Sequence, residues 1–505
     1  MQKIRDIFCK AFAVFFSFLF LALIFVDKRI KYFSPLNCSV PNIVLVLIGV
    51  VPILVLLIFG SRIKRFINKF TARECKMLLV IAGIVLYIIQ LYIIYNTYYQ
   101  AGWDCGMIAE MSEKLARGEL MIRDSGYYSS YLSQNPHQAF IVFILTVIKK
   151  VSNHFGTQDM YYFSVMVGAL SVNMTCILLT LAVKNMKGRY PAALTFIIAV
   201  VFLAFSPQST VPYTDVYAMV FNAAILYLYT CKEKKLKWIL IAIVAFIGYH
   251  IKATVMICFI AIGICEFLKC NRTNFLKRFF IAVFLVFVSG FVSGLIVQYG
   301  INYIGFEPDK DAAFTPTHYA MMGLNDVTTG VWYEEDVNYS ASFDNISDRQ
   351  RGNVKIIGER LREKGLLGLL AFEFRKLLMN YNDGSFYFWK EGGAVLWKSD
   401  PPNHTASKLL RFYYFRQHNK IMNHVLQTQW LMVLMLASIA AWSFIKVNCD
   451  GEFILAVTII GITMFTLMFE GRSRYLILYT PYYLVLAVIG LINVEGKIIQ
   501  KLDMD

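Results

Sequence analysis

Residues 77–94 read MLLVIAGIVLYIIQLYII, and this stretch decides the class of fold. It carries no charge, and a helix of this length can cross the roughly 30 Å of a bilayer's hydrocarbon core. Just before it lies a loop dense in basic residues: Arg62, Lys64, Arg65, Lys69, Arg73 and Lys76. Short loops rich in Lys and Arg stay in the cytoplasm, so these two features together predict a membrane span and its direction.

The rest of the chain has the same apolar character. Of its 505 residues, 58% are hydrophobic and only 16% are charged, which is unlike an ordinary soluble domain. Further apolar runs occur at 12–26, 43–59, 163–183, 192–205, 216–230, 238–249, 253–267, 279–297, 426–445, 453–469 and 475–492. The sequence therefore predicts an all-α polytopic membrane protein with about twelve transmembrane helices.

The basic residues predict the topology. Alternation from the loop at 62–76 puts the other basic clusters on the same side: Lys184/Lys187/Arg189, Lys232/Lys234/Lys235/Lys237, Lys269/Arg272/Lys277/Arg278, Lys446 and Lys497/Lys501. We expect a multi-pass protein of the cell membrane with both termini in the cytoplasm. The orientation of the hairpin at 12–59 stays open, because basic residues flank its first run on both sides: Lys3, Arg5 and Lys10 before it, Lys28, Arg29 and Lys31 after it.

Charge and cysteine usage exclude other classes. The net charge of +16 is spread over short clusters and forms no single basic face, so we expect no nucleic-acid partner. The ten cysteines lack metal-like spacing, and most lie in apolar runs or at their basic ends. No disulfide framework is predicted, and only Cys38 and Cys105 would face outward.

Two long segments, 98–162 and 301–425, then fall outside the cell. In the first, Ile108, Met111 and Leu115 share one helical face, and 137–153 forms a second apolar stretch, so we predict two helices on the outer membrane surface. In the second, apolar residues recur at helical spacing: Val354, Ile357, Leu361, Leu366, Leu370 and Leu377. This pattern predicts one amphipathic helix whose apolar face must be covered by the membrane or by the external portion of the chain.

The chain is thereby divided into four parts. Residues 1–76 form a helical hairpin and a basic cytoplasmic loop, and residues 77–300 form a transmembrane core that includes the external loop 98–162. Residues 301–425 form the second external region. Residues 426–505 form the C-terminal transmembrane helices.

The first candidate for chemistry is Asp104, in the stretch Gly102-Trp-Asp104-Cys-Gly-Met-Ile-Ala-Glu110. It follows the run 77–94 at the outer membrane face, where a carboxylate can take a proton from a sugar hydroxyl as that hydroxyl attacks. An acid near a helix N-terminus also serves as a cap, so this alternative stays open. Asn135-Pro-His137 leads the second surface helix, where a lone histidine is more often structural.

These features, in this order, resemble the GT-C superfamily of membrane glycosyltransferases, in the style of the protein O-mannosyltransferases and the lipid A aminoarabinose transferases. The residues that carry the resemblance are Trp103-Asp104, Ala109-Glu110-Met111 and Asn135-Pro-His137 after an outward helix. The resemblance covers roughly 77–278 and 469–481, and 301–425 matches by position only. It implies that Asp104 is the catalytic acid and that the donor is a sugar on a polyprenyl phosphate or diphosphate. The hairpin at 12–59 departs from the pattern, because it precedes the helix that would normally be first.

Two further charged residues lie at helix ends. Asp215, in Pro212-Tyr213-Thr-Asp215, either caps the helix that follows or adds a polar group to the site, together with Tyr213. Lys252 interrupts the run 238–267, so it must reach the outer interface, a carboxylate or a phosphate. Only some members of the superfamily use a metal, and the acidic residues here show no metal-ligand spacing, so no cofactor is assigned and a divalent cation is left open.

The stretch Glu470-Gly-Arg472-Ser-Arg474-Tyr475 puts two arginines on the outer side, against the usual trend. An ion pair with Glu470 would explain one of them. The stretch also resembles the C-terminal motif of the superfamily, which implies that Arg472 and Arg474 bind the phosphate as it leaves. A guanidinium suits that role because it makes bidentate hydrogen bonds to phosphate.

The second external region is rich in turn residues, aromatic rings and acids, a mixture that suits carbohydrate binding and also ordinary loops. Its candidate residues for an acceptor are His318, Asn325 and Asp326, before Trp332 and Asp336. The sequence thus favours transfer of a sugar to an envelope glycan, polymer or lipid at the outer membrane face. A transporter or flippase of lipid-linked sugars and a glycan polymerase or ligase remain as alternatives; no internal repeat supports the transporter.

Overall fold

The computed structural model describes residues 2–25, 39–97, 99–156, 159–232, 235–269, 272–388, 403–415, 420–445 and 449–502. The predicted flanks Lys28, Arg29 and Lys31 lie outside these ranges, as do Cys38, Lys234 and Lys446. The described residues are helical and contain no β-strand, which confirms the predicted all-α class.

The first part of the chain forms helices at the predicted positions. Their bounds are α1 Gln2–Phe25, α2 Asn42–Asn68, α3 Ala72–Thr97, α7 Met160–Lys187, α8 Arg189–Ala199 with the π-turn η3 Val200–Ala204, η4 Pro207–Thr210, α9 Thr214–Thr230, α10 Lys235–Ile251, η5 Ala253–Val255, α11 Met256–Lys269 and α12 Arg272–Tyr303. The C-terminal part adds α18 Lys420–Ser443, α19 Asp450–Met468, α20 Arg474–Ile477 and α21 Thr480–Leu502. Each of the twelve predicted runs falls on one or more of these helices, and eight of the helices are long and apolar enough to span a membrane.

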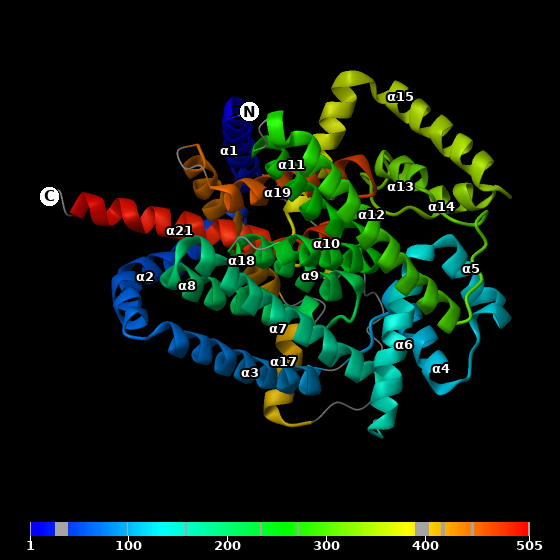
Figure 1. Cartoon of the computed structure of the whole chain (residues 1–505), viewed down its shortest axis with the longest axis horizontal. Coiled ribbons are helices and arrows are strands. Elements are labelled where there is room, and N and C mark those ends of the chain that lie inside the picture. The colour runs from blue at the N-terminus through cyan, green and yellow to red at the C-terminus, as the bar shows by residue number, and fades with distance from the viewer. Residues whose placement is uncertain are drawn as a thin grey trace.

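Shorter helices make up the two predicted external regions. The first contains α4 Trp103–Arg117, η1 Ile122–Asp124, α5 Gly126–Gln134, η2 Pro136–Gln138 and α6 Ala139–His154; the second contains α13 Pro316–Gly323, α14 Glu334–Ala341, α15 Ile346–Tyr381 and α17 Thr405–Phe415. In Figure 1, α4, α5, α6, α13 and α14 gather on the right, while the C-terminus and the turn between α2 and α3 lie on the left. Most helices of the two regions predicted to be external therefore share one end of the molecule, whereas α17 packs against α3.

The predicted apolar face of α4 is confirmed. Ile108, Met111 and Leu115 are buried, and α4 packs against α6 through this side. Lys149 of α6 is fully buried and donates to the carbonyl oxygen of Ala109, which ties the two helices together.

The single amphipathic helix predicted for 354–377 is wrong in one respect. The chain is helical on both sides of Gly365, but this residue has φ 58° and ψ −177°, so the helix bends sharply there. A left-handed backbone is readily adopted only by glycine, which explains why the bend falls on it. Figure 1 shows α15 as a long arm that turns inward at this bend.

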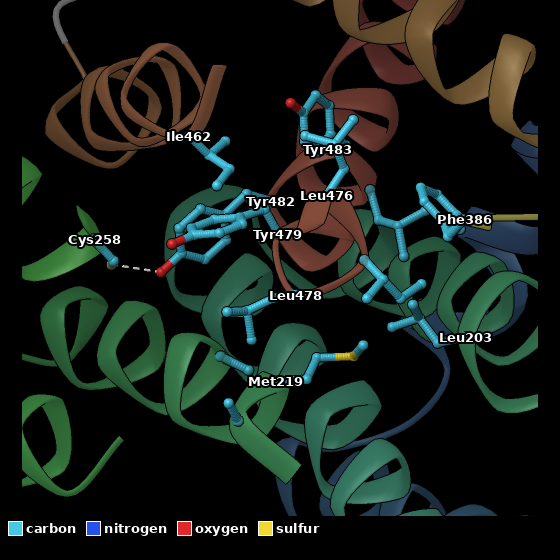
Figure 2. Packing of buried hydrophobic residues seen from close by; sticks show 14 of the residues in the cluster. Leu203, Met219, Cys258, Phe386, Ile462, Leu476, Leu478, Tyr479, Tyr482 and Tyr483 are labelled. Atoms are coloured by element: carbon cyan, nitrogen blue, oxygen red, sulfur yellow. Dashed lines mark hydrogen bonds between the residues drawn. The ribbon is translucent and has the colours of Figure 1, made fainter. Parts of the chain in front are cut away.

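The main core lies among the predicted spans. α18 packs against α21, α1 and α2, and α7 packs against α8 and α9, so the first helices of the chain contact the last ones. Figure 2 shows this core at the start of α21, where Tyr479 and Tyr482 point the same way and the hydroxyl of Tyr482 meets the thiol of Cys258. At the cytoplasmic end of the predicted topology, Arg5 of α1 pairs with Asp450 of α19 at 2.9 Å.

Candidate functional site

Asp104 lies in the first turn of α4, where the positive end of the helix dipole favours an acid. Its side chain is half-buried. Burial, and then the negative charge of Asp104, raise the pKa of the Tyr131 phenol. The same two causes, in the same order, raise the pKa of the Tyr213 phenol. Asp104 therefore stands near two buried phenols contributed by other segments.

Trp103 begins α4 in a strained conformation. Its φ of 46° lies in the left-handed region, which costs a bulky residue on the order of 1–3 kcal/mol. The indole ring meets the Tyr213 ring edge-on, with 4.6 Å between their centroids. The guanidinium of Arg474 lies over the indole, 4.6 Å from its centroid. These contacts hold the ring beside Asp104 and connect it to the C-terminal stretch.

Asp215 is the point where two cations meet. Its side chain is 4% exposed, and its Oδ1 lies 2.9 Å from Nζ of Lys252. Its Oδ2 lies 3.8 Å from Nε of Arg474, a residue some 260 positions away along the chain. Of the three alternatives for Lys252, the structure shows the carboxylate. Asp215 lies in the first turn of α9, but its carboxylate faces cations and makes no cap hydrogen bond.

Aromatic rings surround the two cations. Nζ of Lys252 lies 5.1 Å from the centre of the Tyr475 ring and 5.8 Å from that of Tyr213. The Arg474 guanidinium is 5.2 Å from the Tyr213 ring and 5.6 Å from the Tyr475 ring. Rings within about 6 Å of a cation attract it through their negative faces. We call Asp104, Trp103, Tyr213, Asp215, Lys252, Arg474 and Tyr475 the acid–cation cluster.

Glu470 and Arg472 form the ion pair that the sequence left open. Nε and a terminal nitrogen of Arg472 donate to Oε1 of Glu470 at 2.9 and 2.8 Å. The hydroxyl of Tyr475 donates to Oε2 of Glu470 at 3.2 Å, so this pair adjoins the acid–cation cluster.

The second region predicted to be external, 301–425, comes near Asp104 and Glu470 at Tyr319. Burial, and then the charges of Glu470 and Asp104, raise the pKa of its phenol. Its carbonyl oxygen accepts a hydrogen bond from the backbone N–H of Glu470 at 2.8 Å. A Cβ at Gly323 would lie 2.5 Å from the backbone of Phe469, so only glycine permits this contact of α13 with the turn after α19.

His137 and Gln138 also face this cluster. Nε2 of Gln138 donates to the hydroxyl of Tyr213 at 2.9 Å. Surrounding protein atoms and then the charge of Lys252 lower the pKa of His137, although part of its side chain stays exposed. His137 therefore lies at the surface of the site, near Lys252.

The other predicted site residues have local partners. Glu110 lies on the exposed side of α4 and pairs with Lys114 at 2.7 Å. His318 is buried, and its Nδ1 shares a 2.7 Å hydrogen bond with the Ser340 hydroxyl. Asn325 donates to Oδ2 of Asp336 at 2.8 Å. Asp326 pairs with Lys364.

One buried acid near the site, Asp383, was not predicted from the sequence. Asp383 is fully buried, and its carboxylate accepts hydrogen bonds from the Ser473 hydroxyl at 2.6 Å and from the Tyr387 N–H at 2.8 Å. Ser473 stands between Arg472 and Arg474, and the Tyr387 ring lies 5.6 Å from the Arg472 guanidinium. Asp383 therefore fixes the turn that carries both arginines. The only sequence signal was Asp383-Gly384, which is typical of ordinary turns.

The described residues were also compared with the ligand sets that bind divalent cations. Across the described ranges, no three side chains among His, Cys, Asp and Glu come together in a way that could hold a metal ion.

The family-level comparison gives one clear result. Residues 1–493 match the model of a family described as conserved hypothetical integral membrane protein. The chain belongs to this family. Family membership and the apolar helices together make it a multi-pass membrane protein. No curated protein matches the sequence.

Among solved structures, the chain is similar to two crystal structures of ArnT from Cupriavidus metallidurans. The apo structure has 12% sequence identity and a TM-score of 0.34, and the structure bound to undecaprenyl phosphate has 11% identity and a TM-score of 0.33. Each match covers 84% of this chain and 78% of the other. Similarity this loose carries no argument about activity or ligands, which must be argued from the acid–cation cluster.

Proposed function

We propose that this family member is a membrane glycosyltransferase of the GT-C type. It transfers a sugar from a polyprenyl-phosphate carrier to an envelope glycan, polymer or lipid on the non-cytoplasmic face of the cell membrane. The observation that carries the proposal is the meeting of Lys252 and Arg474 at one buried carboxylate, beside the tryptophan that precedes Asp104.

The cations suit the donor. Departure of a polyprenyl phosphate develops negative charge on its oxygens, and fixed cations placed there stabilise the transition state. Lys252 and Arg474 approach opposite oxygens of Asp215, so they stand close enough together to bind one phosphate group. Asp215 orients them in the absence of donor, and Arg472 is held nearby by Glu470.

Asp104 suits the role of the general base that takes the proton of the acceptor hydroxyl. As the acceptor oxygen bonds to the anomeric carbon, its proton passes to the Asp104 carboxylate. The bond between that carbon and the phosphate oxygen breaks, and its electron pair leaves with the phosphate. A single displacement of this kind inverts the anomeric centre and needs one base and a stabilised leaving group. The core at 77–300 and the C-terminal turn supply both.

The second external region is the proposed acceptor side. Tyr319 lies near both Glu470 and Asp104, and the hydrogen bond from the backbone N–H of Glu470 to the carbonyl oxygen of Tyr319 fixes the position of α13. His318, Asn325 and Asp326 then act mainly by shaping this region, since each already has a side-chain partner.

The test uses purified protein in liposomes with polyprenyl-phosphate sugar and candidate acceptors. We expect Asp104→Asn to lower kcat by about 10²–10⁴-fold, the usual contribution of a positioned general base. Asp124→Asn is the matched control, because Asp124 is an exposed acid of the same external region, 70% exposed at its side chain. Transfer that survives Asp104→Asn would remove this residue from the mechanism. Movement of the lipid-linked sugar across the bilayer without transfer would show a flippase instead.

A further inference from the structure

Lys376, near the end of α15, is a fully buried lysine outside the acid–cation cluster. Its ammonium donates to three backbone carbonyl oxygens, each at 2.7 Å: those of Gly323, Leu467 and Phe469. An ammonium group has three N–H donors, and this arrangement uses all of them. Lys376 therefore acts on the backbone and not directly on a ligand.

The three carbonyl oxygens belong to two helix ends. α19 ends at Met468, between Leu467 and Phe469, and α13 ends at Gly323. The last carbonyl groups of a helix have no partner within it, and the helix dipole makes this end negative, so a cation there is favourable. One ammonium thus caps α19 and α13 together.

The side chain of Lys376 is enclosed by the two segments that follow these helix ends. The Gly471 N–H donates to the carbonyl oxygen of Gly330 at 2.9 Å, so the two segments are bonded to each other. A Cβ at Gly330 would lie 2.6 Å from Cε of Lys376, which leaves no room there for a larger residue. The position of Lys376 is therefore fixed by close packing as well as by hydrogen bonds.

The turn 469–474 carries the two arginines that we propose to bind phosphate. Lys376 holds the first residue of this turn through the carbonyl oxygen of Phe469. Between the two arginines, the Ser473 hydroxyl donates to Asp383 at 2.6 Å. Lys376 and Asp383 lie close together in the sequence, so one short stretch of chain holds this turn at two points.

We propose that Lys376 is a positioning residue for the lipid-linked donor. By capping α19 and α13 together, it holds the turn 469–474 so that Arg474 stays beside Asp215 and Trp103. This inference rests on the proposed function for the identity of the ligand, whereas the effect of Lys376 on the turn can be measured without any ligand.

The first test measures hydrogen exchange of the full-length protein in nanodiscs. The backbone N–H groups of Glu470 and Gly471 are hydrogen-bonded to residues 319–330, so both should exchange slowly in the wild type. We expect Lys376→Met to speed exchange several-fold in peptides that cover this turn. Lys355→Met is the matched control, because Lys355 is a lysine of the same helix with a side chain that is 73% exposed. Equal exchange in Lys376→Met and the wild type would overturn the proposal.

The second test separates positioning from loss of folded protein. Loss of folded protein lowers kcat and leaves KM unchanged, whereas misplaced arginines weaken donor binding. We expect Lys376→Met to raise KM for the polyprenyl-phosphate sugar by up to about 10²-fold. Lys376→Gln keeps two N–H donors, so it should fold even where Lys376→Met does not and should raise this KM less. An unchanged donor KM in these variants would overturn the role of Lys376, whereas absence of transfer by the wild type would refute the proposed function instead.

Discussion

The acid–cation cluster and the network around Asp336 are both rich in charged residues, yet they are organised in opposite ways. Asp336 is 5% exposed, receives two hydrogen bonds from Arg360 at 2.7 and 3.0 Å, and accepts a third from Asn325. In the acid–cation cluster, Asp215 has two cations at 2.9 and 3.8 Å and no directed hydrogen bond to either oxygen.

This difference is the one we expect between a structural network and the proposed reactive site. A buried carboxylate with a bidentate arginine has its lone pairs filled, so its residues have little left to offer a ligand. Cations that share one carboxylate at unequal distances, against aromatic rings, can rearrange around an incoming phosphate.

The largest effect is expected from Arg360→Met. It leaves the buried charge of Asp336 without its partner, which costs about 3–5 kcal/mol of unfolding free energy. Thermal or denaturant unfolding in detergent would measure the loss. An unfolding free energy close to that of wild type would mean that the Asp336 network is not structural.

Arg474→Met should behave in the opposite way. We expect kcat/KM for the lipid-linked donor to fall about 10²–10³-fold, as when one donor to a developing oxyanion is removed. Its unfolding midpoint should change much less than that of Arg360→Met. Arg474→Lys should recover only part of the activity, because an ammonium cannot reproduce the planar fork of a guanidinium. Full recovery would show that charge alone suffices.

His318 gives the second region a pH dependence. Burial lowers its pKa from an ordinary 6.5 to about 4, so between these values the unfolded chain holds a proton that the folded one lacks. The stabilisation is complete above pH 6.5 and is lost as the pH falls towards 4; at pH 5 the loss is about 2 kcal/mol. His318→Gln should lose less stability than wild type between pH 7 and pH 5. Parallel curves for the two proteins would contradict this.

The smallest effect is expected from Tyr475→Phe. It removes the 3.2 Å hydrogen bond to Glu470 and keeps the ring beside Lys252 and Arg474. A single such bond is worth about 0.5–1.5 kcal/mol, so KM for the donor should rise a few-fold. Tyr475→Leu, which also removes the ring, should cost more. If both variants lose the same amount, the ring contributes nothing to the cluster.

The sequence predicted the helices well because their signals are local. Apolar runs and the basic residues between them lie side by side in the chain, so the position of each helix could be read directly. Gly365 is also a local signal, because glycine is a weak helix former. The helical repeat of apolar residues continues past it, so the sequence predicted one helix where the structure has a bend.

Contacts between distant segments leave no local signal in the sequence. The sequence indicates Asp104, Asp215, Lys252 and Arg474 separately, from their places along the chain and from the resemblance, and the structure brings the last three into one ion cluster with Trp103. Nothing local distinguished Asp383 from a turn residue, because its partner Ser473 lies 90 positions away. Asp336 was equally ambiguous, since Arg360, which fills its lone pairs, lies 24 positions further on.

The packing of α1 against α18 and α19 has a consequence for biosynthesis. α1 leaves the ribosome well before Asp450, which pairs with its Arg5 and lies 445 positions further along the chain. At about 5–20 residues per second, α1 waits on the order of tens of seconds in the bilayer before α18 and α19 exist. Until then Phe12 and Phe16, which are buried in the finished protein, lack their ring contacts with Phe444 and Tyr483. α1 is thus inserted early, and its packing is completed late.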